Sequence, residues 1–243
     1  MSSSDSAAGL KKASDSTNQP TKTSFPLFDL EHQFAFYGSY HVNPVNVAIH
    51  IICVPTIFFT ALILSHYFSF FASTVLSVQP ITIPQWLLNT GLYGSESTYE
   101  LNLATLTALG YATYFIILDP IAGSLYAPLL LSFGQWSNQL YALKTIALPG
   151  SNDLMSVYSL ALGIFIAGWI AQFIGHGKFE GRAPALIDNL LQSIVLAVFF
   201  VFIEVLFKFG YRKSLQVRLK NRIGKAVLEF RRSKALSTTT TLS

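Results

Sequence analysis

The chain alternates between long apolar runs and short polar segments. The runs cover residues 45–71, 101–118, 121–131, 154–174 and 190–209. About 20 consecutive apolar residues are enough for an α-helix to cross the hydrocarbon core of a bilayer. The pattern therefore predicts an all-α fold, an integral membrane helical bundle of four to five apolar helices.

Capping residues and prolines mark the boundaries of these runs. Asn43 can cap a helix and Pro44 suits its first turn, so the first helix is expected to begin there. Asp119 precedes a proline and closes the second run, and the helix of the short run at 121–131 is expected to continue amphipathically beyond it. The residues at 149–153 predict a turn before the fourth run.

The composition supports a membrane protein with polar ends. Apolar residues make up 51% of the chain and charged residues 12%, against roughly 25% charged in soluble domains. Residues 1–24 are rich in Ser, Thr, Lys and Asp and cannot bury enough surface to fold. The expected organisation is a disordered tail at 1–24, a membrane helical bundle domain at 25–210 and a basic cytoplasmic tail at 211–243.

The positive charge is concentrated behind the last apolar run. Residues 211–234 contain nine Lys or Arg and one acid, which favours a cytoplasmic flank that contacts anionic membrane lipid. Nucleic acid is not an expected partner, because few aromatic residues are interleaved with these charges. Basic segments near both ends favour cytoplasmic termini, and five complete spans cannot satisfy this. Either the run at 121–131 or the final run is then expected to be re-entrant or interfacial.

Two polar islands interrupt the apolar sequence, and the first lies where the first run begins. His41 precedes the expected helix, while Asn46 and His50 are four residues apart within it and share one of its faces. An unpaired polar group in hydrocarbon costs several kcal/mol. These side chains therefore indicate either a functional site or a hydrogen bond between helices.

The second island follows the fourth run and contains His176, Glu180 and Arg182. His176 and Glu180 are four residues apart, so one helical turn would place the imidazole and the carboxylate on one face. Together with His41 and His50 they form a set of ligands that suits iron, zinc or copper. We therefore predict a metal site formed by these three histidines and Glu180. The alternative is structural, with polar caps at helix ends and a carboxylate that balances nearby positive charge.

Other polar residues have supporting roles in this prediction. Glu180 and Arg182 are predicted to act in catalysis, since a guanidinium group can hold a substrate carboxylate through two parallel hydrogen bonds. His32 and His66 are not expected to take part. Three further side chains could orient the ligands from behind, namely Asn46, Asp188 and Glu204.

The spacing within the two islands resembles that of a known family. The patterns are Tyr37-x2-Tyr40-His41-x4-Asn46-x3-His50-x4-Pro55 and Gly175-His176-Gly-x2-Glu180-x3-Pro184-Ala185-x2-Asp188. Over about residues 25–210 the chain resembles the fungal endoplasmic-reticulum 2-hydroxy fatty acid dioxygenases, which are small multi-pass membrane proteins. The resemblance implies that His41, His50 and His176 bind Fe(2+) and that Glu180 belongs to the site.

The resemblance also implies the reaction. The substrates would be O2 and a 2-hydroxy long-chain fatty acid, which is shortened by one carbon in the breakdown of phytosphingosine. Conversion of R–CH(OH)–COOH to R–COOH and CO2 releases four electrons, and one O2 accepts four. No reducing cofactor is then needed, which fits a chain without a Gly-rich nucleotide-binding loop.

Two other classes of function fit the same residues. Five histidines in the whole chain are too few for the two-iron desaturases, which need about eight. However, a zinc-dependent membrane lipid hydrolase could use three histidines, a carboxylate and a metal-bound water. In a non-catalytic membrane scaffold, the histidines would only bridge helices, and replacing His176 would leave the lipid profile unchanged.

Overall fold

The computed structural model describes residues 26–68, 81–82, 84–91, 98–99, 102–147, 153–184 and 192–241. The disordered tail predicted at 1–24 lies outside these residues, as does Asp188. The main helices are α1 (Leu30–Ser39), α2 (Pro44–Ser65), α5 (Leu103–Leu118), α6 (Pro120–Leu143), α7 (Val157–Ile174), α8 (Ala197–Lys208) and α9 (Lys213–Thr241). Shorter helical segments are η1 (Pro26–Phe28), η2 (His66–Phe68), α4 (Gln85–Leu88) and the π-helical turns η3 (Gly175–Glu180) and η4 (Gln192–Leu196). The all-α class is confirmed.

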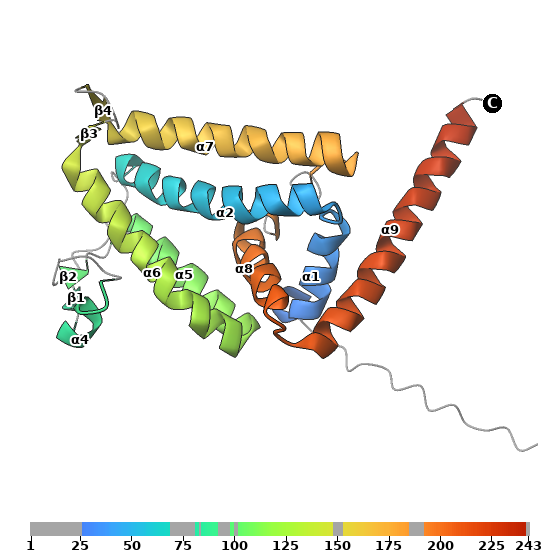
Figure 1. Cartoon of the computed structure of the whole chain (residues 1–243), viewed down its shortest axis with the longest axis horizontal. Helices are drawn as coiled ribbons and strands as arrows, with labels where there is room; N and C mark the ends of the chain where they lie inside the picture. The colour runs from blue at the N-terminus through green and yellow to red at the C-terminus, as the bar shows by residue number, and fades with distance from the viewer. Residues whose placement is uncertain are drawn as a thin grey trace, which may run out of the picture.

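Two antiparallel helix pairs form the body of the molecule. The helices α2 and α7 lie side by side, and α5 and α6 form a second pair that crosses below them (Figure 1). The helix α8 is enclosed between α1, α2 and α6, and its phenylalanines Phe199 and Phe200 are fully buried. The nearly continuous apolar sequence of α8 is therefore explained by contact with protein on several sides.

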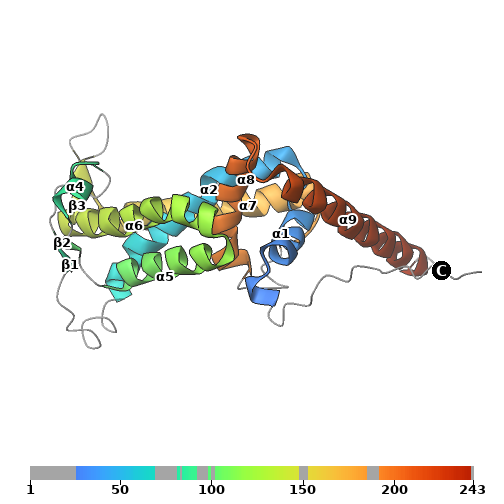
Figure 2. The same cartoon turned by 90° about the horizontal axis from the view of Figure 1, so that it is seen from below.

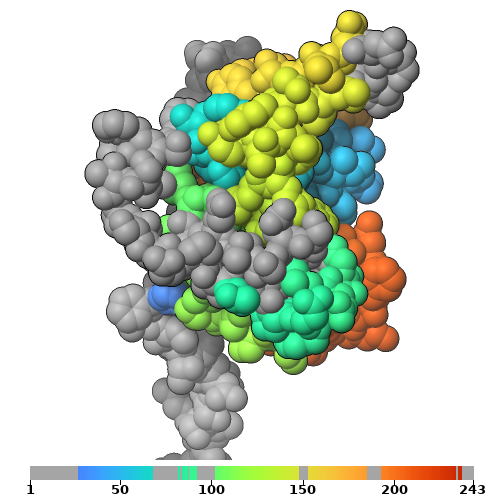
Figure 3. Space-filling model, turned by 90° about the vertical axis from the view of Figure 1, so that its left-hand side faces the viewer, coloured from blue at the N-terminus to red at the C-terminus, as the bar shows by residue number. Residues whose placement is uncertain are grey.

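Two very short antiparallel strand pairs lie at the end of the bundle far from α9. Ile81 and Thr82 of β1 (Ile81–Thr82) pair with Tyr99 and Thr98 of β2 (Thr98–Tyr99). The strands β3 (Thr145–Ala147) and β4 (Leu154–Ser156) pair so that Ile146 is opposite Met155. Figure 3 views this end, where α6 lies between the β3–β4 pair and α4. The helix that the sequence places at 154 thus begins three residues later, after β4.

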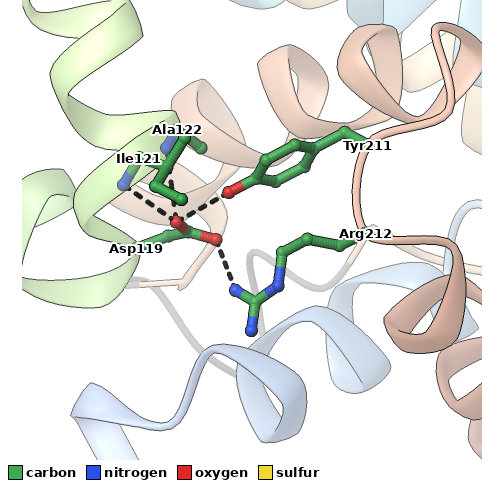
Figure 4. A network of polar contacts seen from close by, with 5 residues as sticks. All are labelled: Asp119, Ile121, Ala122, Tyr211 and Arg212. Carbon is green, nitrogen blue, oxygen red and sulfur yellow. Dashed lines mark hydrogen bonds and ion pairs between the residues drawn. The ribbon is translucent and has the colours of Figure 1, made fainter.

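The helix boundaries follow the predicted caps. Asn43 Oδ1 accepts a hydrogen bond from Val45 N at 2.9 Å, and Pro44 occupies the first turn of α2. The helix of the short run at 121–131 continues to Leu143 as expected. Asp119 ends α5 and caps α6, accepting bonds from the backbone N–H groups of Ile121 and Ala122 (Figure 4).

The same Asp119 carboxylate joins the α5–α6 pair to the turn between α8 and α9. The hydroxyl of Tyr211 donates to Oδ1 at 2.8 Å, and Arg212 pairs with Oδ2 at 2.6 Å (Figure 4). Burial and the bond to Asp119 raise the pKa of the Tyr211 phenol to about 12. This carboxylate is buried and fully used in structure, so it is not available for chemistry.

Only some of the apolar helices are long enough to cross a membrane by themselves. Among the described residues, α2 and the rod Val157–Glu180 are long and apolar enough. The bent pair Ser193–Lys208 and Lys213–Ser233 would add a third if it forms one broken span. The helix α5 has only 16 residues, and the second half of α6 is rich in polar side chains. The structure thus gives two or three possible spans, and does not confirm four to five.

The basic C-terminal segment is a helix of 29 residues, α9, which projects from the bundle (Figures 1 and 2). Its first half packs on α1, where Leu215 and Leu219 are buried and both Arg218 and Arg222 pair with Glu31. The sequence placed the end of the bundle domain at 210, and this boundary stays a prediction. The first part of α9 lies against α1.

Candidate metal centre

Three histidines from separate segments meet at one end of the α2–α7 pair. His41 lies between α1 and α2, His50 lies in the second turn of α2, and His176 lies in η3 directly after α7. Their ring centroids are 4.4 Å apart for His41 and His50, and 4.9 Å for each of the other two pairs. One ligand atom from each ring lies within 4.8 Å of the others, and the three could hold a metal ion.

This spacing is close to what a bound ion requires. Two imidazole nitrogens on one ion, each about 2.1 Å from it, lie at most about 4.2 Å apart. His50 and His176 are each only 3% exposed, so the nitrogens converge in a region that solvent barely reaches.

Backbone carbonyls determine which nitrogen two of the histidines offer. His41 Nδ1 lies 2.8 Å from Tyr37 O, and His50 Nδ1 lies 2.9 Å from Asn46 O. A carbonyl oxygen can only accept, so each Nδ1 carries the proton and each Nε2 presents its lone pair. His41 Nε2 and His176 Nδ1 are buried and have no hydrogen-bond partner among the described residues. Buried nitrogens without a partner, on rings whose ligand atoms converge, are suited to bind a cation.

The environment of His41 keeps its imidazole neutral. Burial lowers its pKa well below the ordinary value, and the neighbouring His50 and His176 lower it further, while the bond to Tyr37 O opposes the shift. The Tyr37 ring stacks on His41 at 3.9 Å between centroids and 17° between planes. Metal ligation requires the neutral imidazole, so these contacts prepare His41 to bind a cation.

Glu180 lies next to this cluster, but its contacts are with the start of α2. Its Oε1 accepts bonds from Val42 N at 2.8 Å, from Asn43 N at 2.7 Å and from Asn46 Nδ2 at 3.2 Å. A carboxylate at a helix N-terminus satisfies free N–H groups and opposes the helix dipole. Glu180 is not in the group of three that could hold an ion, and its predicted role as a ligand stays a prediction.

Close packing between Gly175 and Asn46 joins the two sequence islands. A Cβ atom on Gly175 would overlap Asn46 Oδ1, so only glycine allows the two backbones this approach. Asn46 is fully buried, and its carbonyl holds His50 while its amide donates to Glu180. Asn46 therefore supports the site, as the sequence predicted from its position one turn before His50.

Arg182 is held between two aromatic rings at the edge of the site. Its guanidinium carbon lies 3.4 Å from the centroid of Tyr40 and 4.1 Å from that of Phe230 in α9. Its Nη1 also donates to Ser39 O at 3.3 Å. Arg182 does not line the cavity beside the histidines. Its predicted catalytic role stays a prediction, and these contacts suit a residue that joins η3 to α1 and α9.

A cavity of about 40 Å³ lies beside the three imidazoles. A water molecule needs roughly 10–15 Å³ by the same kind of measure, so the cavity has room for a small polar group and not for a long-chain acid. Its lining joins the histidines to Phe36, Tyr37, Trp169, Gln172, Pro184, Ser193 and Ala197.

Some of these lining residues were missed by sequence reasoning. Trp169 and Gln172 precede His176 by seven and four residues, so all three lie on one face of the continuous helix formed by α7 and η3. Gln172 begins the polar stretch around His176 but was given no role, and the same periodicity could have identified Trp169. Tyr37, interpreted from the sequence as an interface aromatic, is buried and stacks on His41. Burial raises the pKa of the Tyr37 phenol, and the nearby Glu204 raises it further. Ser193 carries no comparable signal.

Two comparisons with known proteins show the family of the chain. A family model described as 2-hydroxy-palmitic acid dioxygenase Mpo1-like matches residues 27–209. The chain is also 36% identical over 196 residues to the 2-hydroxy-palmitic acid dioxygenase MPO1 of Saccharomyces cerevisiae, covering 80% of this chain and 90% of the yeast protein. This chain belongs to the Mpo1-like family.

Membership of the Mpo1-like family confirms the resemblance drawn from the two islands. The matched residues extend from η1 to the end of α8 and include all three clustered histidines. The match ends before α9 begins. No solved structure matches the chain.

Proposed function

We propose that this chain is an Fe(2+)-dependent dioxygenase of the endoplasmic reticulum membrane that shortens 2-hydroxy long-chain fatty acids by one carbon. Such a reaction serves the breakdown of phytosphingosine. The observation that carries the proposal is the convergence of His41, His50 and His176, whose ligand atoms lie within 4.8 Å of one another and of which the last two are buried. The Mpo1-like family supports the substrate class.

The reaction balances without an added reductant. R–CH(OH)–COOH and O2 give R–COOH, CO2 and water, so the substrate supplies all four electrons that O2 takes up. A ferrous ion held by the three imidazoles would supply the binding and activation of O2, a role for which iron with open coordination positions is suited.

The residues of this chain prepare the site for that chemistry. The carbonyls of Tyr37 and Asn46 fix the tautomers of His41 and His50, so that both Nε2 atoms face inward. Aromatic side chains of Phe36, Tyr37 and Trp169 surround the small cavity and limit the access of water. We assign Glu180 and Arg182 to positioning, because their described contacts hold the backbone that carries His41 and His176.

Metal reconstitution tests the proposal. The full chain, purified in detergent and stripped of metal, is loaded with Fe(2+), and oxygen uptake is followed with 2-hydroxypalmitate and with palmitate. We expect uptake of one O2 per pentadecanoate formed, only with iron and only with the 2-hydroxy acid. An active protein that contains zinc and consumes no oxygen would contradict the proposal.

The ligand set also favours a second candidate. Three histidines without a carboxylate in the group form a common catalytic zinc site, in which a bound water acts as nucleophile. A zinc-dependent lipid hydrolase would then fit the same cluster. The two candidates differ in one measurement, since the hydrolase releases its product without oxygen and the dioxygenase does not.

A further inference from the structure

A second, larger cavity adjoins the histidine cavity. Its volume is about 300 Å³, and it lies between α2, α5, α7 and the η4–α8 segment. Its lining is mainly apolar, with Val54, Phe58 and Leu62 from α2 and Phe165 from α7. A cavity of this kind takes a hydrocarbon group rather than a polar one.

The two cavities meet at three shared residues. Trp169, Gln172 and Ser193 line both of them. Ser193 Oγ is buried and has no hydrogen-bond partner among the described residues. A polar group without a partner at this junction can bind a polar atom of a ligand that extends from one cavity into the other.

The large cavity leads away from the histidines along α2. Its lining residues begin one turn after His50, at Val54, and continue through Ala61 to Ser65. At about 1.5 Å per residue, Val54 and Ser65 are about 16 Å apart along the helix axis. An extended polypeptide spans about 3.5 Å per residue of three backbone bonds, or about 1.2 Å per bond, and an extended hydrocarbon chain is similar. This length therefore accommodates about a dozen carbon atoms.

We propose that this cavity holds the hydrocarbon chain of the acyl substrate, with the carboxyl end at the three histidines and the methyl end near Ala61 and Ser65. The inference rests on the proposed function, and adds where the chain lies and which residues limit its length. The chain thus lies within the helical bundle and not in the surrounding bilayer.

Selectivity for length follows from the limited length of the cavity. A chain that arrives from the membrane is already surrounded by hydrocarbon, so each methylene that enters the cavity adds little to affinity. A chain longer than the cavity must bend, leave it or overlap the protein, and packed interiors tolerate added methylenes poorly. The residues that line the far part of the cavity, Ala61 and Ser65, are therefore expected to set the longest acid that reacts well.

Two substitutions, one that fills the cavity and one that enlarges it, test whether the cavity limits the length of the substrate chain. Ala61→Phe fills the far end and is expected to lower kcat/KM for 2-hydroxypalmitate about tenfold relative to 2-hydroxydecanoate. Phe165→Ala enlarges the cavity and is expected to shift the preference toward longer acids. Leu109→Phe is the matched control, because Leu109 is 44% exposed on α5 and does not line the cavity. Equal effects of Ala61→Phe on every chain length, or none, would overturn the proposal.

A binding experiment on metal-free protein tests chain binding in the cavity independently of the reaction. In a Trp86→Phe, Trp136→Phe variant, Trp169 is the remaining tryptophan, and a palmitate brominated along its chain is the quencher. We expect saturable quenching that Ala61→Phe weakens and Leu109→Phe leaves unchanged. If quenching saturates as expected but no oxygen is consumed, only the proposed function fails. If oxygen is consumed but quenching never saturates, or is unchanged by Ala61→Phe, the cavity proposal fails.

Discussion

Buried histidines lie at both ends of α2, and only those at one end form a cluster. At the far end, His66 Nε2 lies 3.2 Å from Ser137 Oγ, and its ring stacks on Tyr141 at 4.7 Å. At the near end, His41 and His50 use one nitrogen each on a carbonyl and leave the other facing His176. Burial alone therefore does not identify a metal ligand. The deciding feature is the presence of two further imidazoles close enough to bind the same ion.

The largest expected effect comes from replacing one histidine at each end of α2 and comparing the two variants. His50→Ala removes one of the three ligands, so bound metal and oxygen uptake should fall at least about a hundredfold, beyond the 10–100-fold typical for residues behind the ligands. His66→Phe keeps the stacking on Tyr141 and should retain full metal content. Metal analysis and oxygen uptake on both variants check this. Equal metal loss in the two variants would remove the distinction between the ends.

The second effect concerns Glu180. Glu180→Ala leaves the N–H groups of Val42 and Asn43 without their acceptor, which should cost about 2–4 kcal/mol of stability and weaken metal binding about tenfold or more. Glu180→Gln keeps an oxygen acceptor and should retain most of both. Thermal unfolding and metal titration measure these quantities. If Glu180→Gln loses metal as completely as His50→Ala, Glu180 is a ligand, as the sequence pattern suggested.

A smaller effect is expected at the glycines on either side of His176. Gly175→Ala forces its Cβ against Asn46, which should cost about 1–3 kcal/mol of stability. Metal binding should also weaken, because a displaced Asn46 no longer holds the His50 ring through its backbone carbonyl. Gly177→Ala meets no atom within 4 Å and is the matched control. Unfolding curves with and without metal compare the two. A Gly177→Ala variant that is destabilised as much as Gly175→Ala would argue against the close contact.

The smallest effect on the site is expected from the buried carboxylate of Asp119. Asp119→Ala removes the cap of α6 and the partner of Tyr211 and Arg212, which should cost about 1–3 kcal/mol. Metal affinity should stay within about threefold, because Asp119 supports the α5–α6 pair and not the histidines. Calorimetry gives both values. A large loss of metal affinity in a folded Asp119→Ala protein would show coupling that these contacts do not provide.

Local signals predicted the elements of the site well. Asn43 and Pro44 fixed the start of α2, and the four-residue spacing of Asn46 and His50 placed them on one face. The grouping of His41 with His50 and His176 came from the paired motifs, and the structure brings the three together. Such signals depend on capping and helical periodicity, which act over a few residues.

The contacts that sequence reasoning missed are made between distant segments. The three bonds of Glu180 to the start of α2 depend on the crossing of α7 and α2, and no spacing of residues encodes them. The same applies to the contact between Arg182 and Phe230. It forms because the basic segment, predicted only as a tail, folds into the helix α9. The sequence alone could not fix the number of spans, because an apolar helix such as α8 can be buried within the protein as well as cross a membrane.

X-ray absorption at the iron edge of the Fe(2+)-loaded full chain is the most direct test of a three-histidine centre. Scattering from three imidazoles is expected, each with an iron–nitrogen distance of about 2.1 Å, close to that of other divalent ions. Replacing any one of His41, His50 or His176 should reduce that number or abolish binding, while His66→Phe should not change it. An iron environment with fewer than two imidazoles, or one unchanged by His50→Ala, would contradict a metal centre at these residues.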